Sequence, residues 1–388
     1  GGNSPLIVID GFPSSSGLEN ISPDEIENVT VLKDAASAAL YGSRAANGVI
    51  LVTTKGAKEG KTNIEFSTYF GLTHVPKRGM PDVMNAQEFA QFKKEYYEDQ
   101  AVYEGYTGGV PQAYQNPQSL DKGTDWFDLL LRDAITQNYN LSLSAGTSKV
   151  KSAVNLNYNK QEGVILETYS ERFSVRANNV FNATDKITFG LNLSGAYRTG
   201  QVTESLGGGR NIIGSALLMD PQLKYKNDDG SYPISFIQPG MFANPNYYLV
   251  LKEQKHPLKH LRGTVNAYMN VELIEGLQYR LSANADLGNE MRERWVPSIA
   301  NGSMFSAPPK PATGWHQNRN YRDWLIENTL TYKKTIAEKH NFDLLAGYTT
   351  QKSWEDQARI RADNYPDDEI AWWGAASTKV GDLGTATT

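Results

Sequence analysis

The 388-residue sequence contains no cysteine, which excludes disulfide bonds, thiol redox centres and cysteine-based zinc sites. It also has no apolar run near the roughly 18–20 residues that a membrane-spanning helix requires. The mean hydropathy is −0.50. A transmembrane β-barrel is compatible with such a low value, because only alternate residues of each strand face lipid.

An excess of basic residues is also missing, since 38 Lys and Arg stand against 43 Asp and Glu, for a net charge of −5. There is no basic stripe along the sequence either. We therefore expect no nucleic-acid partner.

Motifs for catalysis and for resident metals are absent as well. The sequence has no G-x-S-x-G, no H-E-x-x-H and no P-loop, and the glycines at 207–209 precede Arg210 rather than Lys-Ser or Lys-Thr. His256 and His260 have the spacing of a helical metal pair, but Pro257 breaks such a helix. The acidic segments 227–230 and 363–369 lack calcium-loop spacing, which favours solvated turns over calcium sites. We predict neither an enzyme nor a cofactor.

What the chain has is a repeated alternation of apolar and polar residues. Phe189, Leu191 and Leu193 alternate with Asn192 and Ser194, which gives one apolar and one polar face. The pattern predicts about nine strands, several near the roughly 9–11 residues that cross a bilayer when tilted. They are expected at residues 64–70, 139–145, 150–158, 173–181, 187–197, 265–273, 277–287, 324–332 and 342–348.

The connections alternate between short and long. Compact turns are expected at 146–149, 182–185, 274–276 and 334–341, an intermediate connection at 160–170, and long loops at 71–137, 200–259, 288–322 and after 351. Soluble domains rarely hold several loops beyond about 15 residues. Outer-membrane barrels have short periplasmic turns and long outer loops, so the pattern favours such a barrel.

Aromatic residues near the expected strand ends fit interfacial girdles, with cross-strand packing as the alternative. They are Tyr139, Tyr158, Phe181, Tyr197, Trp324 and Tyr348.

The first long loop contains two expected helices. Asn85 and Glu88 predict a capping-box start of a helix over 85–99, with Phe89, Phe92 and Tyr96 on one face. A second, short helix is expected at 124–131. Packing of the first helix on the rim is favoured over a contact with substrate.

The N-terminal region has a different pattern. Residues 30–32 and 49–54 are expected strands, Asp34 can cap a helix over 35–40 that Gly42 ends, and residues 47–48 form a turn. A further strand is expected from Leu6. These residues by themselves predict a small mixed α/β unit with sharp turns.

Two segments of this region, PLIVIDG and VLKDAASAALYGSRAANGVILVTTK, resemble the C-terminal half of the plug domain of SusC/RagA-type TonB-dependent outer-membrane transporters. SRAANGVI is a hallmark of that family. The matching signature residues are Lys33, Asp34, Tyr41, Gly42, Ser43, Arg44, Ala45, Asn47 and Gly48.

The resemblance implies a mainly β fold: a partial transmembrane antiparallel β-barrel, preceded by part of a mixed α/β plug domain. The expected division is residues 1–58 for the plug part and residues 59–388 for the barrel part with long extracellular loops. Because family barrels have about 22 strands, we expect a fragment without the early plug, the TonB-contacting segment and the later strands.

By the same resemblance, the intact protein imports an oligosaccharide or oligopeptide across the outer membrane of a Bacteroidota-type Gram-negative bacterium. A SusD-like surface lipoprotein captures substrate with it, outer-membrane lipid surrounds it, and the TonB complex moves the plug through a segment not in this chain. Arg44 is expected either to pair with a lumen-facing acid and seat the plug, or to be a solvated loop residue.

Two other functions are considered. A passive porin or structural barrel would have no use for the plug-like motif, and a secreted glycan-binding or hydrolytic β protein would leave the long loops unexplained. Aromatic residues expected in the long loops are candidate ligand contacts, with packing within the loops as the alternative. These are Trp315, Trp354, Tyr365, Trp372 and Trp373.

Overall fold

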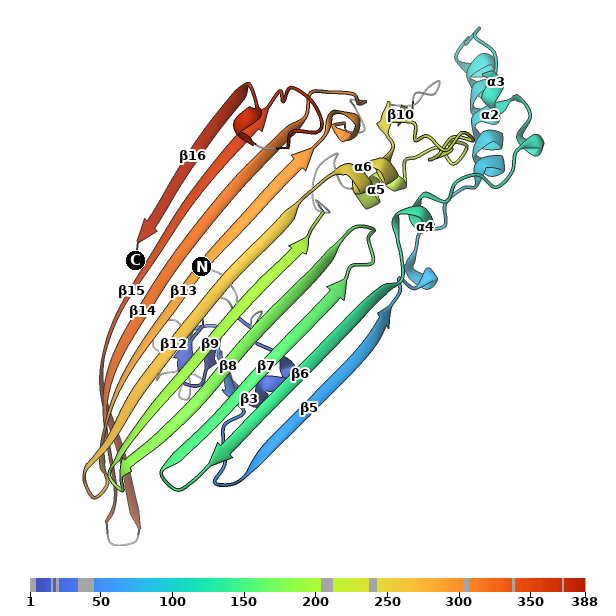
Figure 1. Cartoon of the computed structure of the whole chain (residues 1–388). Coiled ribbons are helices and arrows are strands. Elements are labelled where there is room, and N and C mark those ends of the chain that lie inside the picture. Colours follow the sequence, from blue (N-terminus) through green and yellow to red (C-terminus); the bar gives the residue numbers. More distant parts are fainter. Residues whose placement is uncertain are drawn as a thin grey trace.

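The structure, a computed structural model, describes residues 5–14, 17–18, 21–33, 45–203, 212–236, 243–302, 307–336, 339–371 and 373–387. They contain a small N-terminal sheet and a large, curved antiparallel sheet (Figure 1). Among these residues, none of the helices combines the length and the apolarity needed to cross a membrane.

The N-terminal sheet has the strand order β2-β1-β4-β3. Its elements are β1 (Leu6–Ile9), β2 (Phe12–Pro13), the 3-10 turn η1 (Pro23–Glu25), β3 (Ile26–Leu32) and β4 (Val49–Thr54). β4 runs parallel to β1 and antiparallel to β3. Val8, Ala45 and Val49 form its buried core. The strands expected from Leu6, at 30–32 and at 49–54 are confirmed, whereas the helix expected at 35–40 lies outside the described residues.

In the described residues the large sheet has ten strands rather than about nine, in the order β16-β15-β14-β13-β12-β9-β8-β7-β6-β5. Their bounds are β5 (Gly60–Thr73), β6 (Ala134–Gly146), β7 (Val150–Glu162), β8 (Tyr169–Thr184), β9 (Ile187–Gln201), β12 (Pro257–Ile274), β13 (Leu277–Val296), β14 (Thr313–Ile336), β15 (His340–Asp363) and β16 (Thr378–Thr387).

The expected loops at 288–322 and after 351 were wrong in large part. β13 continues to Val296, β14 begins at Thr313, β15 continues to Asp363, and β16 follows. These strand ends carry polar residues on both faces, so the alternation that marks a strand in sequence is lost there. Gly381 and Gly384 weaken the signal further in β16, which forms because β15 offers it a backbone to pair with. The other expected turns and long loops are confirmed.

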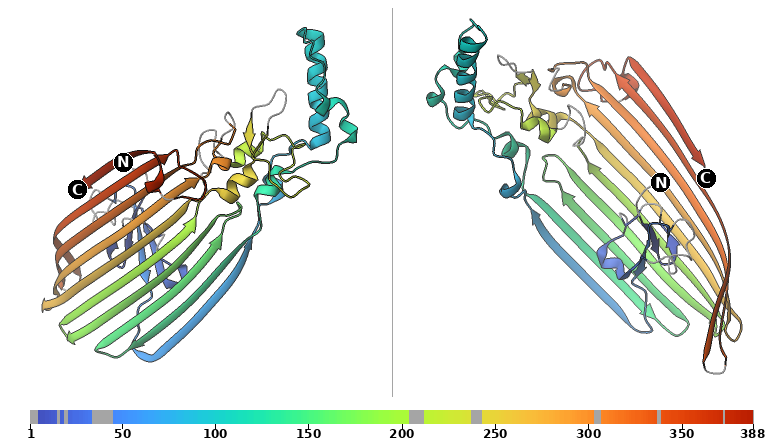
Figure 2. Two further views of the ribbon diagram at one scale, coloured as in Figure 1. Left: turned by 45° about the horizontal axis from the view of Figure 1, so that its top comes forward. Right: turned by 180° about the vertical axis from the view of Figure 1, so that it is seen from behind.

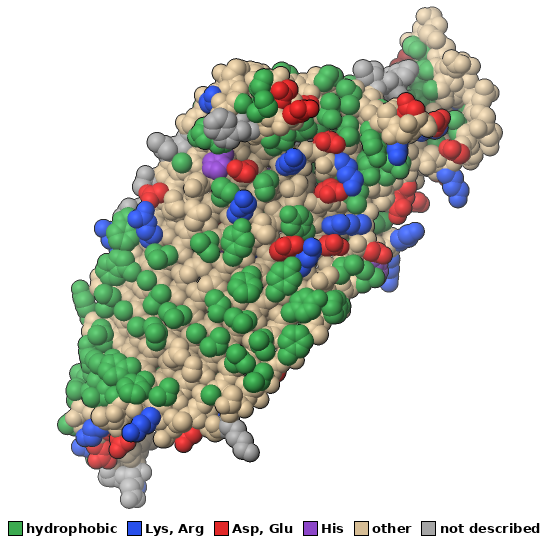
Figure 3. Space-filling model, in the orientation of Figure 1, with side chains coloured by type: hydrophobic (Ala, Val, Ile, Leu, Met, Phe, Trp, Pro, Cys, Tyr) green, Lys and Arg blue, Asp and Glu red, His purple; other side chains and the backbone are tan. Residues whose placement is uncertain are grey.

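The large sheet is curved, and the N-terminal sheet lies on its concave side (Figure 2). On β9, Phe189, Leu191 and Leu193 are exposed on the convex face, whereas Asn192 and Ser194 line a cavity beside the N-terminal sheet. The convex face carries apolar side chains over its middle and lower part, with most of the charged ones above them and some at the lower rim (Figure 3).

The long loops contain short elements: η3 (Lys77–Gly79), α2 (Ala86–Tyr103), α3 (Gln112–Gln115), η4 (Pro117–Ser119) and α4 (Trp126–Leu130) between β5 and β6; α5 (Ile212–Ala216), β10 (Ser235–Phe236), β11 (Asn244–Pro245) and α6 (Tyr247–Glu253) between β9 and β12; η5 (Ser298–Ala300) and η6 (Trp373–Ala375) later. The capping box of Asn85 and Glu88 is confirmed, and Asp125 caps α4.

The packed face of α2 differs from the prediction. Phe89 packs against Tyr114 as predicted, but Phe92 and Tyr96 are 49% and 45% exposed, and the buried residues include Ala86, Ala90 and Tyr97. Small residues decide this packing, because Ala90 lets the helix approach Tyr114 closely.

Candidate functional site: the contact between the two sheets

Polar side chains from one corner of the N-terminal sheet make the contact with the large sheet. The Ser22 hydroxyl accepts a hydrogen bond from the Asp24 amide at 3.4 Å and so caps η1. Pro23 takes the first position of this turn, where no N–H is needed. The turn thereby presents Asp24 and Glu25 to the concave face of the large sheet.

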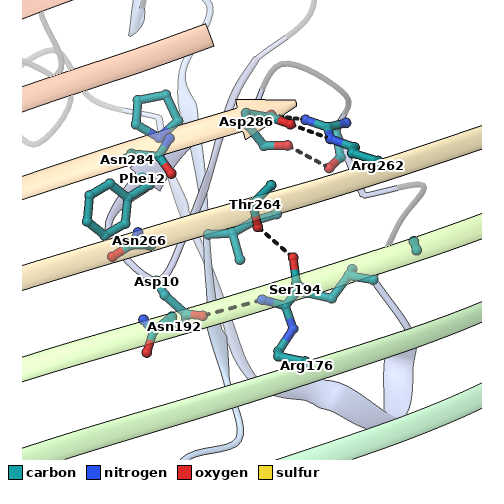
Figure 4. Close-up of a pocket in the computed structure, with 16 residues that line it drawn as sticks. Asp10, Phe12, Arg176, Asn192, Ser194, Arg262, Thr264, Asn266, Asn284 and Asp286 are labelled. Carbon is teal, nitrogen blue, oxygen red and sulfur yellow. Dashed lines mark hydrogen bonds and ion pairs between the residues drawn. The ribbon is translucent and has the colours of Figure 1, made fainter. Parts of the chain in front are cut away.

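Arg176 of β8 is the cation at the centre of this contact. Its Nε donates to Glu25 Oε2 at 2.8 Å, and its Nη1 lies 3.9 Å from Asp10 Oδ2 (Figure 4). Ser174, on the same face of β8, donates to Glu25 Oε1 at 3.4 Å. Glu25 is 2% exposed and Arg176 is 9% exposed. A buried charge that loses its partner is strongly destabilising, so these groups hold the two sheets in one arrangement.

Asp10 connects this ion pair to the N-terminal sheet. It follows β1 with a φ of 51°, a conformation that Asp tolerates better than most residues. Its Oδ1 accepts from the Thr54 amide at 2.8 Å and its Oδ2 from the Thr54 hydroxyl at 2.7 Å. Asn178 Nδ2 donates to the same hydroxyl at 2.7 Å. A continuous network therefore runs from β1 through β4 into β8.

A second contact lies two strands further along the large sheet, on β6. Asn138 Nδ2 of β6 donates to Asp24 Oδ2 at 2.9 Å, and Asn157 Nδ2 of β7 donates to Asn138 Oδ1 at 3.0 Å. Arg172 Nη1 donates to the Ile21 carbonyl at 3.4 Å. Since amides and guanidinium groups donate and the N-terminal residues accept, the contact is complementary in hydrogen bonding as well as in charge.

Little space remains between the N-terminal sheet and strands β9, β12 and β13. A cavity of about 60 Å³ is lined by Phe12 and Ile21 on one side and by Asn192, Thr264 and Asn266 on the other (Figure 4). A larger cavity of about 360 Å³ lies beyond the Arg176–Glu25 pair, against β5, β6 and β7. The first has room for very few water molecules, whereas the second can hold many more.

A second buried ion pair joins two strands of the concave face. Arg262 Nε of β12 donates to Asp286 Oδ1 of β13 at 2.8 Å, and its Nη2 also contacts Asp286. The Arg262 guanidinium lies 5.5 Å from the ring centroid of Tyr321, whose hydroxyl is 2.7 Å from His260 Nε2. His260 thus lies on a strand, and the described residues include no group of three or more His, Asp or Glu side chains placed to hold a metal ion.

The long loops, at the end of the strands opposite the short turns, pack on one another over a common apolar core. It includes Trp126, Leu130, Ile212, Ala216, Met219, Phe236, Tyr247, Val250, Leu251, Val296 and Ala300. Trp126 Nε1 donates to the Asp220 carbonyl at 3.2 Å. Burial raises the pKa of the Asp220 carboxyl to about 6. The carboxylate also accepts a hydrogen bond from the Gln222 backbone amide, which lowers the pKa by a smaller amount. The first two long loops thus form one folded cap.

The signature residues of the N-terminal region are only partly described. Lys33 directly follows β3, Ala45 is buried in the small core, and Asn47 and Gly48 lead into β4. Gly48 has a φ of 89°, and a Cβ there would lie 3.0 Å from the Leu32 carbonyl oxygen, which explains the glycine. The signature residues outside the described part of the chain are Asp34, Tyr41, Gly42, Ser43 and Arg44, so the ion pair expected for Arg44 stays a prediction.

The candidate aromatic residues do not lie together. Trp315 and Trp354 were expected in loops and lie on β14 and β15 instead, because these strands extend beyond the apolar band. Trp315 contacts His256 edge-on at 5.2 Å and has the Arg359 guanidinium over its ring at 4.7 Å. Tyr365 and Trp373 belong to a small core with Trp295. Trp372 lies outside the described residues.

The residues that join the sheets were not among the sequence candidates. Arg176 and Glu25 are separated by 151 positions, so neither points to the other in the sequence. The available signal was the polar face of the strand expected at 173–181, where Arg176 and Asn178 alternate with apolar residues. In the N-terminal region the corresponding signal was a proline followed by two acidic residues, Pro23-Asp24-Glu25, directly before β3.

The comparisons agree with this architecture. Residues 1–49 match the TonB-dependent Receptor Plug Domain family. The chain is 30% identical over 372 residues to TonB-dependent receptor P3 of Formosa agariphila, covering 95% of this chain and 34% of that protein. It is 25% identical to TonB-dependent receptor SusC of Bacteroides thetaiotaomicron, covering 89% of this chain and 35% of that protein. The chain thus spans about a third of the length of these curated relatives.

Among solved structures, the RagAB peptide importer in the closed-closed state superposes with a TM-score of 0.79 at 21% identity. The match covers 100% of this chain and 46% of that one. A second RagAB structure, titled as a peptide transporter, gives a TM-score of 0.78 at 23% identity, over 99% of this chain and 46% of that one. At these identities the likeness concerns the fold, so the N-terminal sheet corresponds to a plug and the large sheet to part of a barrel.

Proposed function

Because the chain belongs to the SusC/RagA family of TonB-dependent outer-membrane transporters, we propose that the whole protein imports a large nutrient across the outer membrane. The proposed cargo is an oligosaccharide or an oligopeptide. The observation that carries the proposal is the plug-like sheet seated against the concave face through Arg176, Glu25 and Asp10. We further propose that residues 1–58 belong to the plug and residues 59–388 to the barrel.

The proposed mechanism is binding and gating, without bond chemistry. At rest, the buried Arg176–Glu25 pair and the Asn138–Asp24 contact hold the plug against the wall. These contacts lie on β8 and β6, so a pull on the plug breaks a small set of polar interactions rather than a large apolar interface. The energy for this step is supplied by the TonB complex.

The proposed partners follow from the family. A SusD-like surface lipoprotein would cover the end of the barrel where the long loops lie and deliver substrate into it. The folded cap built from the first two long loops supports this placement, because it offers a shaped surface at that end. The TonB complex is the proposed partner at the opposite side.

Trp315 is the proposed substrate contact among the aromatic candidates. Its side chain faces inward, because Trp315 lies an even number of residues along β14 from Leu325, which is buried beside the N-terminal sheet. Its half-buried ring beside the Arg359 guanidinium suits a ligand with polar groups around a flat face.

Passive permeability of the full-length protein tests the proposal. Liposomes that contain the purified protein are placed in solutions of oligosaccharides of increasing size, without TonB. A seated plug predicts no swelling beyond that of empty liposomes. Free permeation would favour a passive porin instead, and extraction of the protein from membranes without detergent would favour a secreted β protein.

A further inference from the structure

Two tryptophans and two cations form a compact group on the large sheet, which we name the boundary cluster: Arg322, Trp324, Lys352 and Trp354. β14 and β15 are antiparallel, and their register sets Arg322 opposite Trp354 and Trp324 opposite Lys352. Residues two apart on a strand share a face, so the four side chains lie on one face as a two-by-two block.

This face is the convex one. Leu325, between Trp324 and Ile326, is 4% exposed and lies directly opposite Asn284, a residue of β13 that lines the cavity beside the N-terminal sheet. Leu325 therefore points toward the plug. Alternation along β14 directs Arg322, Trp324 and Ile326 to the opposite side, and Ile326 is accordingly 37% exposed.

The boundary cluster lies where the apolar band of the convex face ends. Toward the short turns, convex positions of the same strands are apolar, as at Leu330 and Leu344, which are exposed. Toward the long loops the convex positions of β14 are polar, and Asn289 Nδ2 of β13 donates to Asn318 Oδ1 at 2.6 Å and to Asn320 Oδ1 at 2.8 Å. Figure 3 shows the same change from apolar to charged side chains across this face.

The two cations of the cluster are available to a ligand. Lys352 Nζ lies 4.5 Å from the ring centroid of Trp354, and among the side chains that the structure describes no carboxylate pairs with it. Arg322 donates through Nη2 to Asp356 at 3.1 Å, but its side chain is 62% exposed. A guanidinium has five N–H donors, so this contact leaves others for an anion.

We propose that the boundary cluster binds the phosphate of a lipid headgroup in the outer leaflet. Indole rings favour the level between acyl chains and headgroups. The cations beside them then meet the phosphate at that level, and Arg322 suits phosphate because its planar fork can donate two parallel hydrogen bonds. The proposal rests on the membrane location proposed above, and it assigns Trp354 to the lipid side rather than to the substrate.

The test uses the full-length protein in phosphatidylcholine nanodiscs, so reconstitution itself checks the membrane location separately. A bisphosphorylated lipid A-type glycolipid is titrated in, and retained copies are counted by native mass spectrometry. The double variant Lys352→Gln with Arg322→Gln should weaken glycolipid binding roughly 30-fold. Each cation near an anionic lipid surface contributes about 1 kcal/mol, and the variant removes two of them. Lys352→Arg should retain the wild-type affinity.

The matched control is Lys333→Gln, which removes an exposed cation of β14 near the opposite end, where it pairs with Asp343. It should leave glycolipid binding unchanged. The proposal is overturned if the control weakens binding as much as the double variant, or if a dephosphorylated glycolipid binds equally well. It is also overturned if millimolar inorganic phosphate displaces the glycolipid completely, since the site would then recognise free phosphate.

Discussion

Replacing Arg176 with glutamine should release the plug from the wall of the barrel. The substitution leaves two carboxylates, Glu25 at 2% exposure and Asp10, without the cation that both face. Breaking a buried ion pair from one side costs about 3–5 kcal/mol. Glu25→Gln should cost less, about 1–3 kcal/mol, because Asp10 remains 3.9 Å from Arg176.

Hydrogen exchange of β4, measured by mass spectrometry on the full-length protein in nanodiscs, reports this release. The Thr54 amide is bonded to Asp10 and is therefore coupled to the contact. By the expected energies, protection of β4 should fall by at least about 100-fold in Arg176→Gln and by less in Glu25→Gln.

The matched control is Arg322→Gln, which breaks an exposed ion pair with Asp356 on the same sheet but away from the plug. Exposed pairs contribute about 0–1 kcal/mol, so β4 should keep its protection. If Arg176→Gln lowers the protection of β4 no more than this control does, the reasoning about the buried pair is refuted.

Three further predictions concern single side chains. Asp220 has a pKa of about 6, raised above its usual value, so the folded cap loses stability as the pH rises from about 4 to 6, by about 3 kcal/mol in total. Asp220→Asn should therefore slow proteolysis of the loop between β9 and β12 relative to wild type at pH 7.5 but not at pH 4. If the variant and the wild type are cleaved at the same rate at pH 7.5, the prediction is wrong. Gly48→Ala should destabilise the plug by about 1–2 kcal/mol because of the φ of 89°, seen as faster exchange of β4; unchanged exchange would show that the turn tolerates a side chain. Asn85→Ala should cost about 1 kcal/mol of helix stability, seen as faster exchange in the first turn of α2 alone, and unchanged exchange there would argue against the cap.

The sequence predicted the strands whose convex face is apolar and whose concave face is polar. Phe189, Leu191 and Leu193 alternate with Asn192 and Ser194, and β9 forms there. The pattern failed beyond the apolar band, where Asn289, Asn318 and other polar residues occupy the convex face too, although backbone pairing continues. Strand length in that zone is set by the neighbouring strand and not by local hydrophobicity.

The site was less predictable than the fold. Arg176 and Glu25 are each ordinary residues in their local sequence, and only the folding of the plug onto β8 brings them together. The aromatic candidates were chosen by type and expected loop position. Their roles diverged once the strand register was known: Trp315 lies on the inner face and Trp354 on the outer one.

The most direct test of the central claim is uptake of a labelled cargo by cells of the native bacterium, with the TonB complex intact or disabled. Growth screens on oligosaccharides and oligopeptides identify the cargo, and deletion of the gene gives the background. The account predicts that disabling TonB reduces uptake to this background, because the plug stays seated on Arg176. Uptake that continues at the normal rate without TonB would contradict it.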